Sequence, residues 1–184
     1  AAVTNAATIT QGAFNIASTA EFTTAANAVV VAGDTGINNA GTLNLTGGTA
    51  ETPVTLASNI SNVSGTTNVQ GYITSAKTIT QSVLTTDSTA HFTSSGNITV
   101  TTLTNAGEIN SNGVDDSHHA VITTSTLGNT GNFNIGNYGE VTVSGTGADS
   151  FTNSGTVKNE GTLTIYGTNT LGSITHNATA ETTE

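Results

Sequence analysis

In this chain of 184 residues a short sequence phrase recurs at a fixed distance, and this recurrence limits the folds that the chain can adopt. It reads LTNAGEINS from Leu103, LGNTGNFNI from Leu127 and FTNSGTVKN from Phe151, so successive starts are equally spaced. A fourth start at Leu171 decays to LGSITHN. Repeats of about 24 residues are typical of proteins that stack similar structural units.

Apolar residues recur at every second position within the phrases, which is the period of a β-strand and not that of a helix. A coil of such turns would stack equivalent positions about 4.8 Å apart, the normal spacing of paired strands. One set of alternating side chains would then point inward. We expect this set to include Leu103, Ile109, Leu127, Phe133, Ile135, Val141, Val143, Phe151, Val157, Leu163 and Ile165.

Each phrase also carries Asn two residues after its first apolar residue, and Gly two residues later. Stacked Asn amides at a bend can bond to one another and to the turn backbone, whereas Gly allows a positive φ or a close approach of neighbouring turns. These positions are Asn105, Asn129 and Asn153, with Gly107, Gly131 and Gly155.

The repeats predict a single all-β domain over residues 1–184, a parallel β-solenoid (β-helix) of about seven or eight turns with a repeat of about 24 residues. A jelly-roll or β-sandwich is the alternative, because short Thr/Val strands with Gly/Asn turns would also suit it. The segment TAEFTTAANAVVV (19–31) resembles TAHFTSSGNITVT (89–101). We interpret the two segments as the same part of the coil, three turns apart.

The composition agrees with a slender core. Apolar residues make up 34% of the chain and charged residues only 8%, while Thr is present in 41 copies. A solenoid needs few inward side chains per turn, and Thr and Val suit strands. The low charge and the alternating pattern argue against a disordered coil.

The net charge of −10, with two lysines and no arginine, argues against nucleic acid and anionic membranes as partners. No stretch approaches the roughly 18 apolar residues that a membrane span needs. Cysteine is absent, which excludes disulfides and thiolate metal sites. The start AAVTN resembles a mature chain after removal of a signal peptide, so we expect a secreted protein at the cell surface.

The densest polar cluster is NGVDDSHHA, in which Asp115, Asp116, His118 and His119 are candidate metal ligands. A solvent-exposed corner loop is the competing interpretation, because no second ligand set completes the site.

SGTGADSF (144–151), with Asp149, matches most of a calcium-roll signature, but that signature acts in tandem and occurs once here. Asp34 is a weaker candidate. We therefore predict neither a metal nor a cofactor.

Sequons occur at Asn44, Asn59, Asn62, Asn97 and Asn177, which is about the number that chance provides in a chain this rich in Asn, Ser and Thr. Acidic residues are scattered singly, Trp and Arg are absent, and no G-x-S-x-G segment places a nucleophile. We therefore expect no enzyme activity.

Threonine pairs of the form T-x-T recur and could form a flat array of hydroxyl and methyl groups, as on ice-binding solenoids. These pairs do not keep the step of the repeat phrases, so Thr could equally be filling outward strand positions. The pairs are Thr8/Thr10, Thr78/Thr80, Thr99/Thr101, Thr124/Thr126 and Thr162/Thr164.

The phrases TNAGEI, TNSGTV and KNEGTL resemble the passenger repeats of bacterial autotransporter and haemagglutinin-type adhesins. The resemblance covers residues 103–170 well and 37–45 in part. It implies a right-handed parallel β-solenoid displayed outside the cell, although this chain is short and lacks a translocator barrel.

We therefore expect a non-enzymatic structural or adhesive surface protein. Residues 1–16 carry no charge and no proline, so they could donate a strand to a neighbouring copy and build a head-to-tail filament. An acidic tail, 178–184, would be frayed. The alternatives are an ice- or glycan-binding module and a fragment of a longer adhesin; partners would be the chain itself, other surface components or glycans.

Overall fold

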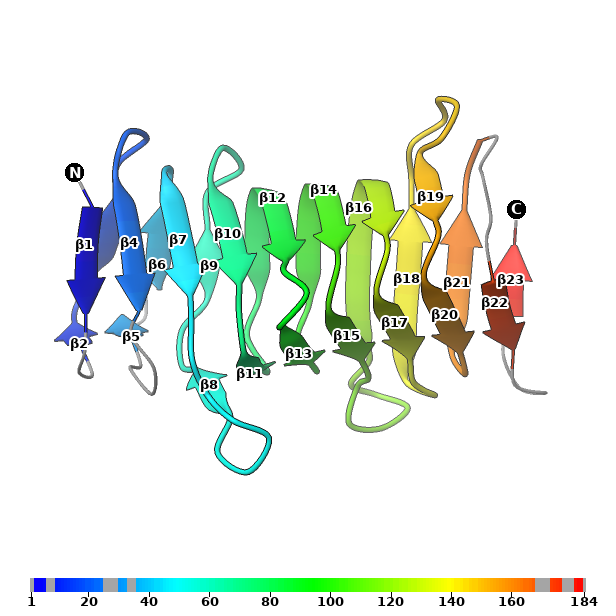
Figure 1. Ribbon diagram of the computed structural model, residues 1–184, viewed down its shortest axis with the longest axis horizontal. Helices are drawn as coiled ribbons and strands as arrows, with labels where there is room; N and C mark the ends of the chain where they lie inside the picture. Colours follow the sequence, from blue (N-terminus) through cyan, green and yellow to red (C-terminus); the bar gives the residue numbers. More distant parts are fainter. Residues whose placement is uncertain are drawn as a thin grey trace.

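The computed structural model describes residues 2–5, 9–24, 30–32, 36–167, 173–176 and 181–183, and these ranges form strands and turns without a helix. The chain winds from β1 at one end to β23 at the other as a parallel β-solenoid (Figure 1). Its paired strands run parallel, which excludes a jelly-roll built from antiparallel neighbours. The predicted fold is confirmed, and the chain is a β-solenoid repeat protein.

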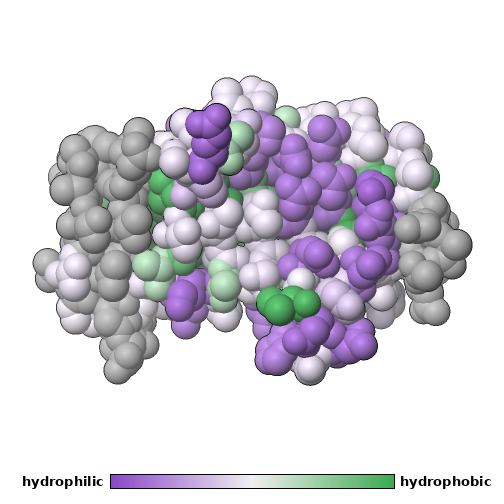
Figure 2. Space-filling model, turned by 90° about the horizontal axis from the view of Figure 1, so that it is seen from below, coloured by the Kyte–Doolittle hydropathy of each residue, from purple (hydrophilic) through white to green (hydrophobic). Residues whose placement is uncertain are grey.

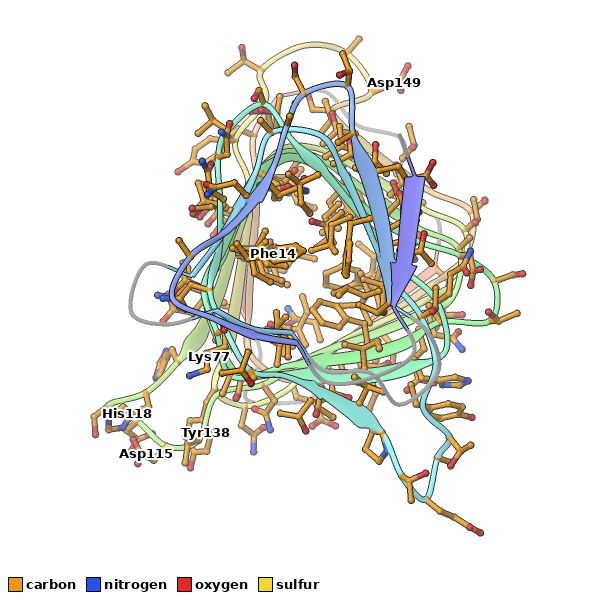
Figure 3. The ribbon with its side chains drawn as sticks, turned by 90° about the vertical axis from the view of Figure 1, so that its left-hand side faces the viewer. Phe14, Lys77, Asp115, His118, Tyr138 and Asp149 are labelled. Atoms are coloured by element: carbon orange, nitrogen blue, oxygen red, sulfur yellow. The ribbon has the colours of Figure 1, made fainter. Side chains whose placement is uncertain are left out.

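The solenoid has three faces around a filled interior, and a turn places a short strand, or half of a long strand, on each face (Figure 3). The first face contains β1 (Ala2–Asn5), β4 (Glu21–Thr24), β7 (Thr42–Leu45), β10 (Thr66–Val69), the second halves of β12 (Ile79–Thr86), β14 (Ile98–Asn105) and β16 (Ala120–Asn129), and β19 (Phe151–Asn153).

The other two faces follow in chain order. The second face contains β2 (Ile9–Gln11) and β5 (Val30–Ala32) as a separate pair, then β8 (Val54–Leu56), β11 (Tyr72–Ser75), β13 (His91–Ser94), β15 (Glu108–Ser111), β17 (Asn132–Ile135), β20 (Thr156–Asn159) and β22 (Ser173–His176). The third face contains β3 (Phe14–Ile16), β6 (Ile37–Asn39), β9 (Ile60–Ser61), the first halves of β12, β14 and β16, then β18 (Gly139–Val143), β21 (Thr162–Ile165) and β23 (Glu181–Thr183).

The core consists of apolar columns that run along the solenoid axis. Strand alternation turns every second side chain inward, and the parallel register stacks these side chains on their counterparts in the next turn. On the second face the column is Val54, Ile73, Phe92, Ile109, Phe133, Val157 and Ile174. All of the inward positions predicted from the sequence are buried.

The length of a turn varies along the chain. On the first face successive pairings lead from Thr4 to Thr152. A turn averages about 21 residues over this path, within the range of repeat units that stack. The step is 24 residues from Asn105 to Asn129, whereas Thr86 precedes Asn105 by only 19. Corner loops of different lengths account for this variation in the number of residues per turn.

Two loops add residues to the turns in which they occur. Residues 46–53 connect β7 to β8, and residues 112–119 connect β15 to β16. Both project from the solenoid beside the second face, whereas residues 144–150, between β18 and β19, project on the opposite side (Figure 1).

The similar segments 19–31 and 89–101 do not occupy the same part of the coil, so that prediction is wrong. Phe22 lies in β4 on the first face, whereas Phe92 lies in β13 on the second face. All three faces demand the same alternation of inward apolar and outward polar residues. Sequence similarity therefore identifies a strand of the solenoid without identifying its face.

The ends of the chain show two further details. Within residues 1–16, the strands β1, β2 and β3 pair with β4, β5 and β6 of the same chain. Within the tail 178–184, residues 181–183 form β23 and pair with β21, so these three residues are in a strand and not frayed. Leu171 lies outside the described residues.

Candidate functional site

The most regular surface feature is a column of threonines on the third face. Thr80, Thr99, Thr123, Thr142 and Thr164 are register partners on β12, β14, β16, β18 and β21. Each alternates with buried neighbours such as Ile79, Ile98, Ile122, Val141 and Leu163, so its side chain points outward. No other residue type interrupts the column over these five strands.

Local geometry makes the column uniform. Paired strands lie about 4.8 Å apart, and a β-branched side chain such as Thr has restricted χ1 rotation. Hydroxyl and methyl groups therefore recur at nearly constant spacing along the solenoid axis. Thr101, Ser125 and Ser144 follow Thr99, Thr123 and Thr142 by two residues. They line a shallow hollow of about 210 Å³ together with Thr80, Thr99 and Thr123 of the column.

The column is not apparent in the sequence because the number of residues between successive threonines varies. The step from Thr99 to Thr123 is longer than the steps from Thr80 to Thr99 and from Thr123 to Thr142. A search at one fixed period therefore fails, although the surface itself is periodic. A search for Thr at outward positions, with the turn length left free, would have detected it.

The predicted T-x-T pairs have mixed positions. Thr78/Thr80, Thr99/Thr101 and Thr162/Thr164 lie at the surface of the third face. Thr124 is buried, and its hydroxyl donates a 2.8 Å hydrogen bond to the carbonyl of Thr126, so the pair Thr124/Thr126 is not part of the array. Thr8 lies outside the described residues.

The stacked asparagines of the repeat phrases lie inside the solenoid. Asn105 donates from Nδ2 to Oδ1 of Asn129 at 2.7 Å, and Asn129 donates in the same way to Asn153 at 2.8 Å. All three side chains are buried. This ladder fills a corner of the fold and is not accessible to a ligand.

Gly131 shows why glycine follows each of these asparagines. A Cβ there would lie 2.0 Å from the carbonyl oxygen of Gly107, and a Cβ at Gly155 would lie 2.1 Å from that of Gly131. None of these three glycines has a positive φ. Of the two predicted reasons for glycine, close approach of the turns is therefore the one that applies.

The four metal-ligand candidates of the 112–119 loop do not form one cluster. Asp115 Oδ1 accepts hydrogen bonds from His118 Nδ1 at 2.9 Å and from the backbone of Ser117, within a small exposed turn. His119 instead contacts Glu140 of β18. Asp116 is exposed in the same loop (Figure 3 labels the neighbouring Asp115 and His118).

Electrostatics of the Asp115 turn follow from these bonds. The hydrogen bond from His118 is the main cause that lowers the pKa of Asp115 from 3.8 to about 2, and Ser117 adds to the effect. Among the described residues no group of three or more His, Cys, Asp or Glu side chains could hold a metal ion.

The remaining sequence candidates are dispersed. Asp149 has a φ of 59° in the 144–150 loop, and Asp34 lies outside the described residues, as does the sequon at Asn177. Asn59 and Asn97 are exposed, and their Oδ1 atoms accept the backbone N–H groups of Thr78 and Val121.

The two other sequon asparagines belong to outer amide ladders. Asn62 donates to Asn38, and Asn44 accepts from Asn68.

Comparisons with models of protein families, with curated proteins and with solved structures found no match for this chain. The resemblance to adhesin repeats therefore rests on the N-x-G phrases alone. Within the described residues, no helix has the length and apolar character to cross a membrane.

Proposed function

We propose that this chain is a non-enzymatic adhesive protein, displayed outside the cell, whose third face attaches to an ordered solid surface. Ice is the surface that this face suits best. The observation that carries the proposal is the uninterrupted column of five threonines in register on β12, β14, β16, β18 and β21.

The periodicity and the rigidity of this face support attachment to an ordered surface. A crystal surface presents the same groups at constant spacing, so it favours a protein that repeats one chemistry at a matching interval. Each threonine contact is weak, but the contacts act together, and the backbone ladders hold them in place before binding. Preorganisation of this kind limits the conformational entropy lost on association.

The chemistry of the array is also suitable. Thr offers a methyl group that orders neighbouring water and a hydroxyl group that both donates and accepts hydrogen bonds. Charged side chains, which hold their hydration water strongly, are absent from the five positions of the column. An acidic group on this face, Glu140, occupies the adjoining outward position of β18 and is paired with His119.

The test uses two substitutions on one strand. Thr99 and Thr104 are both exposed on β14, but Thr99 lies in the column on the third face and Thr104 lies on the first face. Thr99→Lys should abolish most of the thermal hysteresis and of the partition of the protein into growing ice. Thr104→Lys should leave both unchanged.

Circular dichroism should show the same β-structure for all three proteins. Absence of ice partition by the unmodified protein, or equal loss in both variants, would contradict the proposal.

Head-to-tail assembly is a second candidate. The observation in its favour is that β1 ends the strand order of its sheet and pairs only with β4 among the described residues. Light scattering and electron microscopy of the full chain at high concentration test this idea. We expect filaments, and we expect deletion of residues 1–16 to give folded subunits that do not polymerise; a monodisperse full chain would refute it.

A further inference from the structure

The second face carries a network of side chains over four consecutive strands, β11, β13, β15 and β17. The ring of Tyr72 stacks on the imidazole of His91, with centroids 4.1 Å apart and planes 8° from parallel. His91 Nδ1 lies 3.0 Å from Oε2 of Glu108 on the next strand. An aromatic surface and a carboxylate are thereby fixed side by side.

The network continues through two amides. Asn110 donates from Nδ2 to Oε1 of Glu108 at 2.7 Å, and Asn134 donates from Nδ2 to Oδ1 of Asn110 at 2.8 Å. An amide has two N–H donors and an oxygen with two lone pairs. Both amides are therefore held in place by these bonds and have hydrogen-bonding capacity left for a ligand.

The surface around this network is concave. One hollow of about 200 Å³ is lined by Tyr72, His91 and Glu108, with Pro53 of the 46–53 loop on its border. A second hollow of about 420 Å³ extends toward Lys158. The two hollows share Thr93 and Asn110, so they are adjacent, and together they are called the groove.

Two loops border this face. The loops 46–53 and 112–119 project from opposite corners of the second face, and Figure 3 shows the face between them. Figure 2, which looks onto the underside of the molecule, shows mainly hydrophilic side chains between the two protrusions. The groove is thus lined mainly by polar residue types, and it crosses the strands, parallel to the solenoid axis.

Beneath the groove, on the inward side of β15, a polar atom of the described residues has no partner. The hydroxyl group of Ser111 is buried and has no hydrogen-bond partner, and Ser111 lines the larger hollow. The equivalent Ser75 and Ser94 bond to the carbonyls of Lys77 and Gly96 two residues later. The 112–119 loop replaces that tight corner after Ser111.

Charge restricts the ligand. The chain carries −10, and the groove contains the carboxylates of Glu108 and Glu160. The cation that lines it, Lys158, forms a 2.5 Å ion pair with Glu160. A polyanion would be repelled, whereas a neutral ligand rich in hydroxyl groups would find donors, acceptors and an aromatic ring.

We propose that the second face binds a linear, uncharged polysaccharide that lies along the solenoid axis. Paired strands repeat about every 4.8 Å, close to the length of one sugar unit in an extended chain, so successive sugars meet successive strands. One sugar ring packs at Tyr72, and hydroxyl groups of the following sugars bond to Glu108, Asn110 and Asn134. This site is separate from the third face and does not depend on ice binding.

Isothermal titration with defined oligosaccharides tests the site. The probes are the neutral hexamers of β-1,4-glucose, β-1,4-mannose and β-1,4-xylose, and hexagalacturonate as the anionic comparison. At least one neutral hexamer should bind, and hexagalacturonate should not. Because stacking and burial of an aromatic ring contribute about 1.4 kcal/mol or more, Tyr72→Ala should weaken binding about tenfold, and Tyr72→Phe should restore it to within about twofold.

Two further variants distinguish a specific site from a loss of binding that any surface substitution would cause. Asn110→Ala should weaken binding about fivefold through its lost hydrogen bonds, whereas Thr104→Lys, on the first face, should leave it unchanged. The proposal is overturned if no neutral hexamer binds, if hexagalacturonate binds more tightly, or if Tyr72→Ala binds like the unmodified protein. Ice partition, measured separately with Thr99→Lys, fails or succeeds independently of these outcomes.

Discussion

Among the asparagine ladders of this solenoid that have a step of 24 residues, one lies inside the fold and another lies on the outer side of the second face. Asn105, Asn129 and Asn153 form the inner ladder, and Asn110 and Asn134 form the outer one. The amide-to-amide bonds are 2.7 and 2.8 Å inside and 2.8 Å outside. Residue type, spacing and bond length therefore do not distinguish the two ladders.

The other bonds of each amide do distinguish them. Asn129 also donates to the backbone carbonyls of Gly131 and Thr156, so it joins the corner of its own turn to the following turn. Asn134 donates to a side chain on the half-buried outer surface. The inner ladder is consequently part of the fold, and the outer ladder is a preorganised surface. The burial of an asparagine ladder therefore determines whether it stabilises the fold or forms part of the surface.

The largest effect should come from adjacent residues on opposite sides of β17. Phe133 is buried between Ile109 and Val157, so Phe133→Asp places an unpaired charge in the core and should cost more than about 4 kcal/mol. Asn134→Asp should cost less than about 1 kcal/mol, because the group stays near solvent and faces its register partner Lys158.

Urea unfolding followed by circular dichroism measures both variants. Similar losses for Phe133→Asp and Asn134→Asp would show that the two sides of β17 do not differ as the structure indicates.

The two ladders can then be compared with one substitution. Asn129→Ala removes several buried hydrogen bonds at once and should destabilise the protein by about 3 kcal/mol. Asn134→Ala removes one half-buried bond and should cost about 0.5 to 1 kcal/mol. Urea midpoints measure the difference, and equal midpoints would remove the distinction between inner and outer ladders.

Glycine next to the inner ladder gives a smaller, steric comparison. In Gly131→Ala the new methyl group would meet the carbonyl oxygen of Gly107, so the turns must separate at a cost of about 1 to 3 kcal/mol. In Gly128→Ala the nearest atom, Oγ1 of Thr152, is 3.7 Å away, and the change should be within about 0.5 kcal/mol. Thermal unfolding of both variants tests whether close approach, and not backbone freedom, requires glycine.

The smallest effect should arise in the exposed 112–119 loop. The pKa of Asp115 is lowered from 3.8 to about 2, chiefly by the hydrogen bond from His118. A lowered pKa means that this interaction stabilises the folded chain above pH 3.8 and loses its effect as pH falls through about 2. Because the carboxylate is solvent-exposed, salt should weaken the effect.

Carbon NMR of the Asp115 carboxyl group measures this pKa directly. His118→Ala should raise it toward 3.8, while the thermal midpoint at neutral pH should change far less than in Asn129→Ala. An unshifted titration in His118→Ala would assign the effect to Ser117 instead.

The groove on the second face shows what the sequence could not reveal. Tyr72, His91 and Glu108 are unequally spaced along the chain, and of the three only Glu108 lies in one of the N-x-G phrases. Their outward orientation could have been read from the alternation with Ile73, Phe92 and Ile109. Their position beside one another depends on the length of each intervening turn.

The strands, the inward residues and the stacking of Leu103, Leu127 and Phe151 could all be predicted from the sequence. These features follow from alternation, which is a local property of an extended chain, and from three phrases with equal spacing. The folded chain was needed to show that Phe22 and Phe92 lie on different faces, and that one column is formed by Thr80, Thr99, Thr123, Thr142 and Thr164. The physical reason is that register between turns depends on how many residues each corner accommodates, and that number is set by packing and hydrogen bonding at the corner.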